Sequence, residues 1–107
     1  MKRILHVEDD RVWLSVVSGI LKDAGYQIIS VDSIAKARSH LDQADVIICD
    51  GNLDEEETGD GFAFARELHD QGRKVLIFAS LRPDSNIPFI AKGRYSDESL
   101  VKMVAQL

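Results

Sequence analysis

Three acidic residues and one lysine stand at the carboxyl ends of short apolar runs in this sequence. Glu8 and Asp9 follow the first run, Asp50 ends a run in the middle of the chain, and Lys92 ends a later one. If these runs are parallel strands, their carboxyl ends meet at one edge of a sheet, where open α/β sheets bind ligands. Two carboxylates about 4 Å apart repel each other by roughly 4 kcal/mol at an effective dielectric of about 20, so either a cation lies among them or a pKa rises.

The chemistry that suits these residue types is phosphoryl transfer with Mg²⁺. Mg²⁺ binds hard oxygen ligands, keeps several waters and shares a substrate phosphate. A carboxylate beside Mg²⁺ and an ammonium is well placed to attack phosphorus and form an acyl phosphate. We therefore interpret Asp50 as a phosphoryl acceptor. Glu8 and Asp9 are interpreted as metal ligands, and Lys92 as the cation that neutralises the transferred phosphoryl oxygens.

The elements that must position these residues alternate along the chain. Apolar runs typical of strands cover 3–7, 26–31, 45–49, 74–79 and 88–92. Segments of helical spacing follow the first three runs and the last, and their expected starts or caps are Asp10, Asp32 or Ser33, Asp60 and Ser96. The second helix is expected to carry Ile34, Ala37 and Leu41 on one face. This alternation predicts a parallel, doubly wound α/β sheet with right-handed crossovers, and the weakly apolar run 26–31 is expected at an edge.

The connection between the fourth and fifth runs departs from this alternation. Residues 80–88 contain Pro83, Pro88 and an Asp-Ser-Asn cluster, which oppose a regular helix. Parallel strands normally need a crossover of about a dozen residues or more. Eight extended residues nevertheless span roughly 26 Å, enough to run back along a strand of about 17 Å. We therefore predict that a loop replaces the fourth helix and that the fifth strand is parallel.

A loop in this place would leave the apolar face of the fourth and fifth strands partly bare. Large apolar patches on monomers are uncommon, so we expect a second copy of the chain or a downstream protein partner to cover the face near residues 80–92. The competing topology is a tight hairpin with an antiparallel fifth strand. That topology would carry Lys92 to the wrong edge of the sheet.

Length, charge and cysteine content narrow the class of protein. The 107 residues predict a single domain, 1–107, large enough to bury a core. A net charge of -5 argues against nucleic acid as a partner, because phosphate binding needs clustered Lys and Arg. No apolar run reaches the roughly 18 residues of a membrane span. The single cysteine fits a reducing compartment, so we expect a cytoplasmic location.

Four short motifs occur in order along the chain, three at predicted strands and their ends and one at the predicted start of the third helix. They are RILHVEDD (3–10), ADVIICDGNL (44–53), GDGF (59–62) and FIAK (89–92). Together they resemble the receiver domain of two-component response regulators, with its acidic pair, acceptor strand, third helix and lysine-bearing fifth strand. Each motif is weak alone, but the resemblance covers nearly the whole chain. It implies a CheY-like, flavodoxin-like fold with strand order 2-1-3-4-5.

The resemblance implies a role for each residue of the site. Asp50 would be the phosphorylated aspartate, and Lys92 would pair with the phosphoryl group. Asp9, with Glu8 partly through water, would bind Mg²⁺ together with Asp50. The backbone carbonyl of Asn52 would complete the protein ligands, and the Asn52 side chain would tune the lifetime of the phosphoryl group.

The switch residues depart from the family pattern. The family's switch Thr or Ser aligns with Ala79, and the nearest hydroxyl is one residue later, on Ser80. A one-residue shift normally points a side chain to the other face of a strand, but strand ends are less strict, so Ser80 stays a candidate for phosphoryl binding. Phe89, three residues before the lysine, takes the place of the aromatic switch residue. Gly93 stands where a proline usually follows the lysine, and the loop after Asp50 is longer than usual and very acidic.

The resemblance also implies a function. A histidine kinase or phosphotransfer protein would donate the phosphoryl group, and the change of charge at Asp50 would switch partner binding. The chain would catalyse at most its own phosphorylation and dephosphorylation, so we do not expect an enzyme. A second interpretation is a receiver-like interaction module without phosphorylation, which Ala79 and the missing helix favour. A third is a Mg²⁺-dependent phosphohydrolase, against which Asn52 stands in place of the required general acid.

Several other residues receive structural interpretations. Asp10 is expected to cap the first helix, and His6 and Cys49 are expected to be buried structural residues. Trp13 is expected in or near the core on the first helix, where its fluorescence would report metal or phosphoryl binding nearby.

Overall fold

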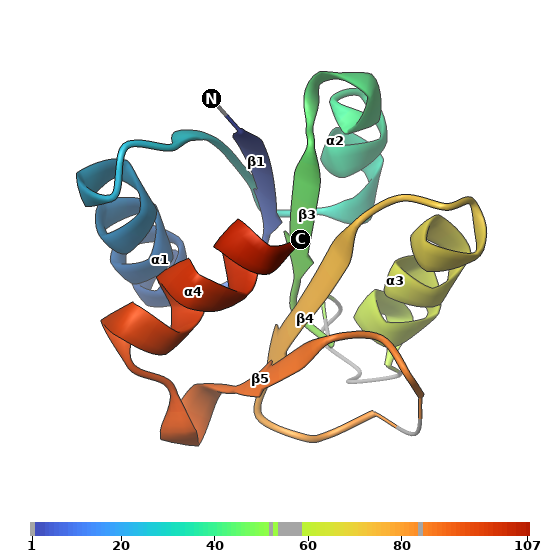
Figure 1. The fold of residues 1–107 in the computed structure, drawn as a ribbon. Helices are drawn as coiled ribbons and strands as arrows, with labels where there is room; N and C mark the ends of the chain where they lie inside the picture. The colour runs from blue at the N-terminus through green and yellow to red at the C-terminus, as the bar shows by residue number, and fades with distance from the viewer. Residues whose placement is uncertain (1, 52, 54–58, 84) are drawn as a thin grey trace.

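The chain folds into one parallel sheet with helices on both faces (Figure 1). The structure is a computed structural model that describes residues 2–51, 53, 59–83 and 85–107. Its strands are β1 (Arg3–Val7), β2 (Gln27–Val31), β3 (Val46–Cys49), β4 (Val75–Ala79) and β5 (Phe89–Ala91). Its helices are α1 (Arg11–Asp23), α2 (Ile34–Arg38), α3 (Asp60–Asp70) and α4 (Asp97–Gln106), with short 3₁₀ turns at Leu41–Gln43 and Lys92–Arg94. The observed strand order β2-β1-β3-β4-β5 confirms the predicted α/β fold and places β2 at an edge.

Side-chain caps start three of the helices. The Asp10 carboxylate accepts hydrogen bonds from the N–H groups of Val12 (2.8 Å) and Trp13 (3.4 Å), as predicted. Ser33 rather than Asp32 caps α2, and Ser96 caps α4 in a reciprocal pair with Ser99.

The second helix is shorter than the sequence pattern indicated. It ends at Arg38, and Leu41 lies on the 3₁₀ turn rather than on the helix. Leu41 still packs against the core, because the turn carries it back toward the sheet.

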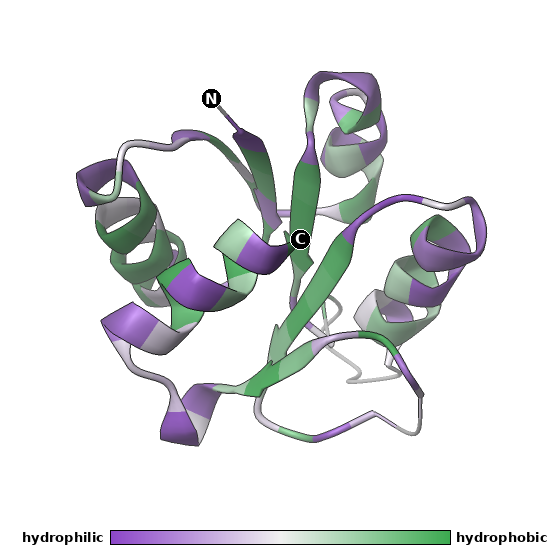
Figure 2. Ribbon diagram, viewed as in Figure 1, coloured by the Kyte–Doolittle hydropathy of each residue, from purple (hydrophilic) through white to green (hydrophobic). Residues whose placement is uncertain are grey.

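The core forms two layers, one on each face of the sheet. Figure 2 shows that the strands are the most continuously hydrophobic elements and that the helices mix hydrophobic with hydrophilic residues. The layer under α2 and α3 includes Leu5, Val7, Ile47, Phe64, Leu68 and Ile77. The layer under α1 and α4 includes Ile4, Val17, Leu21, Ile48, Phe78 and Leu100. Burial on both faces explains why the central strands read as continuous apolar runs.

The connection from β4 to β5 contains no helix in its described residues, 80–83 and 85–88. The fifth strand is parallel to β4, with Ile77 opposite Phe89 and Ala79 opposite Ala91. This pairing confirms the predicted parallel return and excludes the antiparallel hairpin. Lys92, the residue after β5, therefore reaches the same edge of the sheet as Asp50.

The connection between β4 and β5 itself covers part of the sheet face that we expected to be partly bare. Ile87 is only 6% exposed and packs into the layer under α2 and α3. A groove of about 300 Å³ remains beside it, lined by Phe62, Ala63, Arg66, Ile77, Pro83, Ser85 and Ile87.

Among the described residues, no helix has the length and apolarity to cross a membrane.

Candidate functional site

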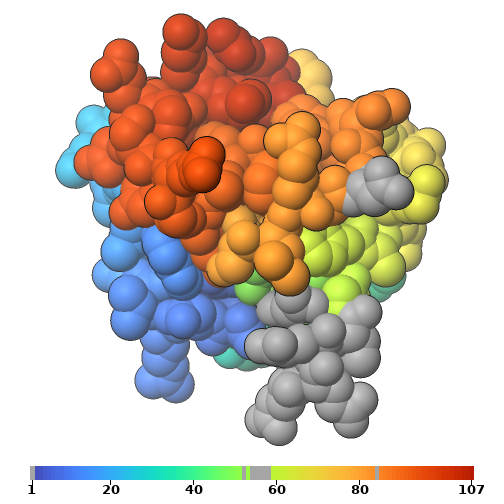
Figure 3. Space-filling view, turned by 90° about the horizontal axis from the view of Figure 1, so that it is seen from below, coloured from blue at the N-terminus to red at the C-terminus, as the bar shows by residue number. Residues whose placement is uncertain are grey.

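The sheet ladder fixes two of the acids at the carboxyl ends of their strands. The backbone N–H of Glu8 donates to the Val31 carbonyl (3.0 Å), and that of Asp50 donates to the Val7 carbonyl (3.0 Å). These bonds extend the pairing of β1 with β2 and of β3 with β1 by one residue. Figure 3 looks onto the lower end of the molecule as Figure 1 shows it, where the strands end and the orange β4–β5 connection crosses the surface.

Three carboxylates converge at this edge. Oxygen atoms of Glu8, Asp9 and Asp50 lie within 4.8 Å of one another. Glu8 is fully buried and Asp50 is 9% exposed, whereas Asp9 is exposed. The backbone N–H of Gly51 donates to Asp50 Oδ1 at 2.8 Å and holds the orientation of that carboxylate.

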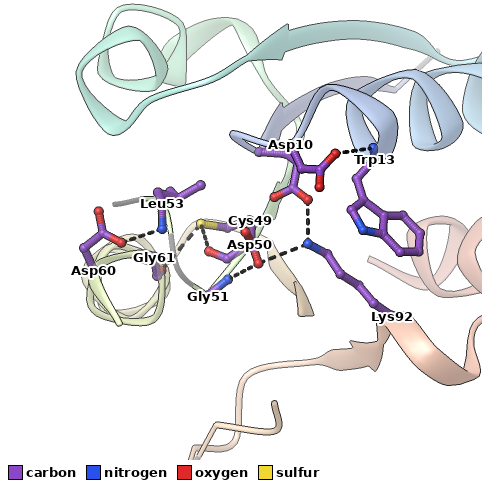
Figure 4. A network of polar contacts seen from close by, with 10 residues as sticks. Asp10, Trp13, Cys49, Asp50, Gly51, Leu53, Asp60, Gly61 and Lys92 are labelled. Carbon is purple, nitrogen blue, oxygen red and sulfur yellow. Dashed lines mark hydrogen bonds and ion pairs between the residues drawn. The ribbon is translucent and has the colours of Figure 1, made fainter. Parts of the chain in front are cut away.

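The ammonium of Lys92 lies among these acids. Its Nζ is 2.5 Å from Glu8 Oε1 and 3.3 Å from Asp50 Oδ1. Figure 4 shows the Lys92 side chain, on the right of the view, pointing toward Asp50 and lying beside the Trp13 ring. The structure therefore brings together the four charged residues that the sequence analysis selected.

The electrostatics of the site favour the binding of a further cation. Burial, reinforced by the Asp50 carboxylate, raises the pKa of Glu8 to about 8. Burial and Asp50 also raise the pKa of Asp9. Among the described residues, the buried Oε2 atom of Glu8 has no hydrogen-bond partner. One ammonium for three carboxylates, together with a buried unpartnered oxygen, fits a divalent cation with oxygen ligands.

The start of α3 packs directly against the backbone of Asp50. A Cβ atom on Gly61 would lie 1.8 Å from the Asp50 carbonyl oxygen, and one on Gly51 would lie 2.2 Å from the Phe62 ring. The Phe62 N–H donates to the Gly51 carbonyl (3.1 Å). The sequence analysis did not select these two glycines, because the motifs that contain them, ADVIICDGNL and GDGF, indicated only the acceptor strand and the start of a helix.

The predicted switch positions Ala79, Ser80 and Phe89 are uncharged, unlike the residues of the acidic cluster. Ala79 is buried at the end of β4, and Ser80, the next residue, is exposed. Phe89 lies half-buried in β5 with the Arg82 guanidinium 5.7 Å from its ring centroid. Asn52, the expected carbonyl ligand, lies outside the described residues.

Two buried residues next to the site behave as the sequence analysis expected. Burial and the nearby Lys92 lower the pKa of His6 to about 3, so its ring is neutral. Burial raises the pKa of the Cys49 thiol above its ordinary value. A buried neutral thiol is a small packing residue and not a reactive thiolate.

Comparisons with known proteins agree with this fold. Among solved structures, the chain is similar to chemotaxis protein CheY4 of Vibrio cholerae, with 23% identity, a TM-score of 0.77 and coverage of 99% of this chain and 98% of that one. It is also similar to the signal receiver domain of a modulated diguanylate cyclase from Desulfovibrio desulfuricans G20 (21% identity, TM-score 0.83, coverage 99% and 92%). A third similar structure is the receiver domain of Francisella response regulator 1452 (17% identity, TM-score 0.81, coverage 99% and 95%).

At these identities the solved structures show the fold alone, and none of the curated proteins matches the sequence. The family comparison is more specific. The sequence pattern of the response regulator receiver domain matches residues 4–104, from β1 to α4. This chain therefore belongs to the response regulator receiver domain family.

Proposed function

We propose that this receiver domain accepts a phosphoryl group on Asp50 from the phosphohistidine of a histidine kinase or a phosphotransfer protein. The observation that supports it most is the cluster of three carboxylates within 4.8 Å, with the Lys92 ammonium 3.3 Å from Asp50. A chain without such chemistry gains little from burying Glu8, because even a buried ion pair such as Glu8–Lys92 is often no more stable than apolar residues of similar volume.

In the proposed transfer, a carboxylate oxygen of Asp50 forms a new P–O bond as the P–N bond of the donor breaks. The donor imidazole leaves and takes up a proton from solvent. The Gly51 N–H orients the attacking carboxylate, and Lys92 neutralises charge on the phosphoryl oxygens. Asp50 is 9% exposed, so a donor side chain can approach it from the open edge of the sheet.

Mg²⁺ is the cation that we propose for this site. Glu8, Asp9 and Asp50 would hold it, with the backbone carbonyl of residue 52 as a fourth ligand that stays a prediction. When bound, Mg²⁺ supplies positive charge at the phosphoryl oxygens. Lys92 now contacts both Glu8 and Asp50, so we expect metal binding to weaken its pairing with Glu8.

We propose that phosphorylation switches the binding of a downstream protein or of a second copy of the chain. The groove of about 300 Å³ between α3 and the β4–β5 connection lies beside Phe89, the candidate aromatic switch residue, because Ile77 lines it and pairs with Phe89. Ser80 stays the candidate hydroxyl for the phosphoryl group, since Ala79 has none. Sedimentation with and without beryllofluoride tests the dimer version, which a monomer under both conditions would contradict.

The test of phosphorylation uses acetyl phosphate and Mg²⁺ with the intact mass as readout. We expect the mass of one phosphoryl group on the wild type, none on Asp50→Ala, and wild-type labelling of Asp45→Ala. Asp45 is a matched control, because it is an exposed acid that precedes the same strand at its opposite end. An unlabelled wild type, or equal labelling of Asp50→Ala, would contradict the proposal.

A module that binds partners without phosphorylation is the second candidate. Ala79 favours it, because the buried end of β4 offers no hydroxyl to a phosphoryl group. The same labelling experiment separates the two candidates. In this version, wild type and Asp50→Ala would bind the same partner equally well in the presence of Mg²⁺ and acetyl phosphate.

A further inference from the structure

The Lys92 side chain has two kinds of neighbour. On one side are the carboxylates of Glu8 and Asp50, and the side chain is only 9% exposed. On the other side are aromatic rings. The Lys92 Nζ lies 5.4 Å from the centroid of the Trp13 ring and 6.0 Å from that of Phe78.

These distances are those of cation–π interactions. An ammonium within about 6 Å of a ring centroid is attracted to the ring face, most strongly to indole, and more strongly where water is excluded. Trp13 has the shorter of the two distances and the more strongly attracting ring. Figure 4 shows the Trp13 indole beside the Lys92 side chain, on the side away from Asp50.

The ring of Trp13 is itself held in place. Trp13, Phe78 and Tyr95 contact one another edge to face, with centroids 5.3 to 5.5 Å apart and interplanar angles of 73° to 87°. The three rings come from α1, from β4 and from the residue after the 3₁₀ turn that carries Lys92. We call them the ring cluster. It ties the segment that bears Lys92 to α1.

The segment after Lys92 needs such a tie. Gly93 follows directly, and it has no side chain to anchor the turn; nothing lies within 4 Å of the place where its Cβ would be. Tyr95 is the first half-buried residue beyond it. Its contacts with Trp13 and Phe78 restrain the carboxyl-terminal end of the segment, and the pairing of β5 with β4 restrains its amino-terminal end.

We propose that Trp13 is a positioning residue for Lys92: its indole face holds the ammonium beside Asp50. The proposal concerns phosphorylation at Asp50 and so rests on the proposed function. The carboxylates that now pair with Lys92 are the groups that would bind a divalent cation, whereas an aromatic face is no ligand for Mg²⁺. The ring therefore provides a contact for Lys92 that metal binding does not compete for.

The test compares Trp13→Leu with Trp13→Phe, which keeps a ring, and with Tyr26→Leu as a matched control. Tyr26 is a half-buried aromatic of the same core layer that has no contact with Lys92 among the described interactions. The first readout is NMR of Lys92. We expect its ε-methylene protons to be shifted upfield by the ring current in the wild type and in Tyr26→Leu, and to return toward ordinary values in Trp13→Leu.

The second readout is the rate of Asp50 phosphorylation by acetyl phosphate at fixed Mg²⁺. We expect Trp13→Leu to lose about threefold to tenfold, the equivalent of one cation–π contact, and Trp13→Phe to recover most of that loss. Equal losses in the Leu and Phe variants, or an unchanged rate in Trp13→Leu, would overturn the proposal. So would unshifted Lys92 protons in the wild type, a result that needs no folded variant. A wild type that shows the upfield shift but no phosphorylation would overturn the proposed function while the Trp13–Lys92 contact stands.

Discussion

Gly61 couples the start of α3 to Asp50, and its replacement by alanine tests this coupling. A Cβ atom there would lie 1.8 Å from the Asp50 carbonyl oxygen and 2.7 Å from the Gly51 carbonyl carbon. Both are backbone atoms, so neither can rotate away as the end of a side chain can. Relief requires α3 or the backbone at Asp50 to move by about 1.6 Å to reach the 3.4 Å of ordinary contact.

Two opposing effects set the magnitude. Alanine is favoured over glycine inside a helix by up to about 1 kcal/mol. Overpacking costs about 1–3 kcal/mol and occasionally more. A backbone clash of this size belongs at the upper end of that range, so we expect Gly61→Ala to lose about 2 kcal/mol of unfolding free energy and to slow phosphorylation of the displaced Asp50.

Two other glycines give a graded control. Gly51→Ala would meet the ring of Phe62, a half-buried side chain that can turn aside, so we expect a smaller loss. Gly19 lies in α1 with open space around it, so Gly19→Ala should stabilise the protein by up to about 1 kcal/mol. Urea unfolding followed by the fluorescence of Trp13, the single tryptophan, measures all three. A Gly61→Ala protein as stable and as readily phosphorylated as the wild type would refute the reasoning.

Three further predictions concern pH, a cap and the connection. Because the pKa of Glu8 is raised to about 8, the folded chain keeps a proton that the unfolded chain loses near pH 4.5. The free energy of unfolding without metal should therefore fall by a few kcal/mol between pH 4.5 and 8. In urea unfolding, saturating Mg²⁺ or the substitution Glu8→Gln should reduce this fall. Asp10→Ala removes the carboxylate that caps α1 and should cost about 1 kcal/mol in the same assay; no loss would show that water replaces the cap. Ile87→Ala should cost about 2–4 kcal/mol, because Ile87 is the one buried residue among the described residues of the connection. A loss below about 1 kcal/mol would mean that the groove beside it collapses to fill the space.

The sequence was sufficient to predict the strands, their order and the meeting of the four charged residues. The reason is that three strands are buried on both faces and therefore read as uninterrupted apolar runs. Once the strands are parallel, any residue that follows one must reach the same edge. Glu8, Asp50 and Lys92 were thus placed by topology alone.

Contacts between residues distant in the sequence escaped prediction. The approach of Gly61 to Asp50 depends on the angle at which α3 meets the sheet, and no local pattern encodes that angle. The ring cluster joins residues 13, 78 and 95, which belong to three separate segments, and the sequence analysis placed only Trp13 in or near the core. The sequence also left open whether Asp32 or Ser33 caps α2, because either side chain suits a cap position.

The missing helix changes the surface of the domain more than its site. Lys92 keeps its place because β5 pairs with β4 directly, with Ala91 opposite Ala79, and this pairing needs no helix above it. Ile87 closes part of the exposed layer, and Tyr95 restrains the chain on the other side of Lys92. Two departures from the family pattern, the missing helix and Ala79, therefore change the groove beside α3 and the end of β4, where a partner or a phosphoryl group would bind. We accordingly expect substitutions in the groove, such as Arg66→Ala, to change partner binding while the rate of Asp50 phosphorylation stays the same. A simultaneous loss of phosphorylation would show that the groove and the acidic site do not act independently.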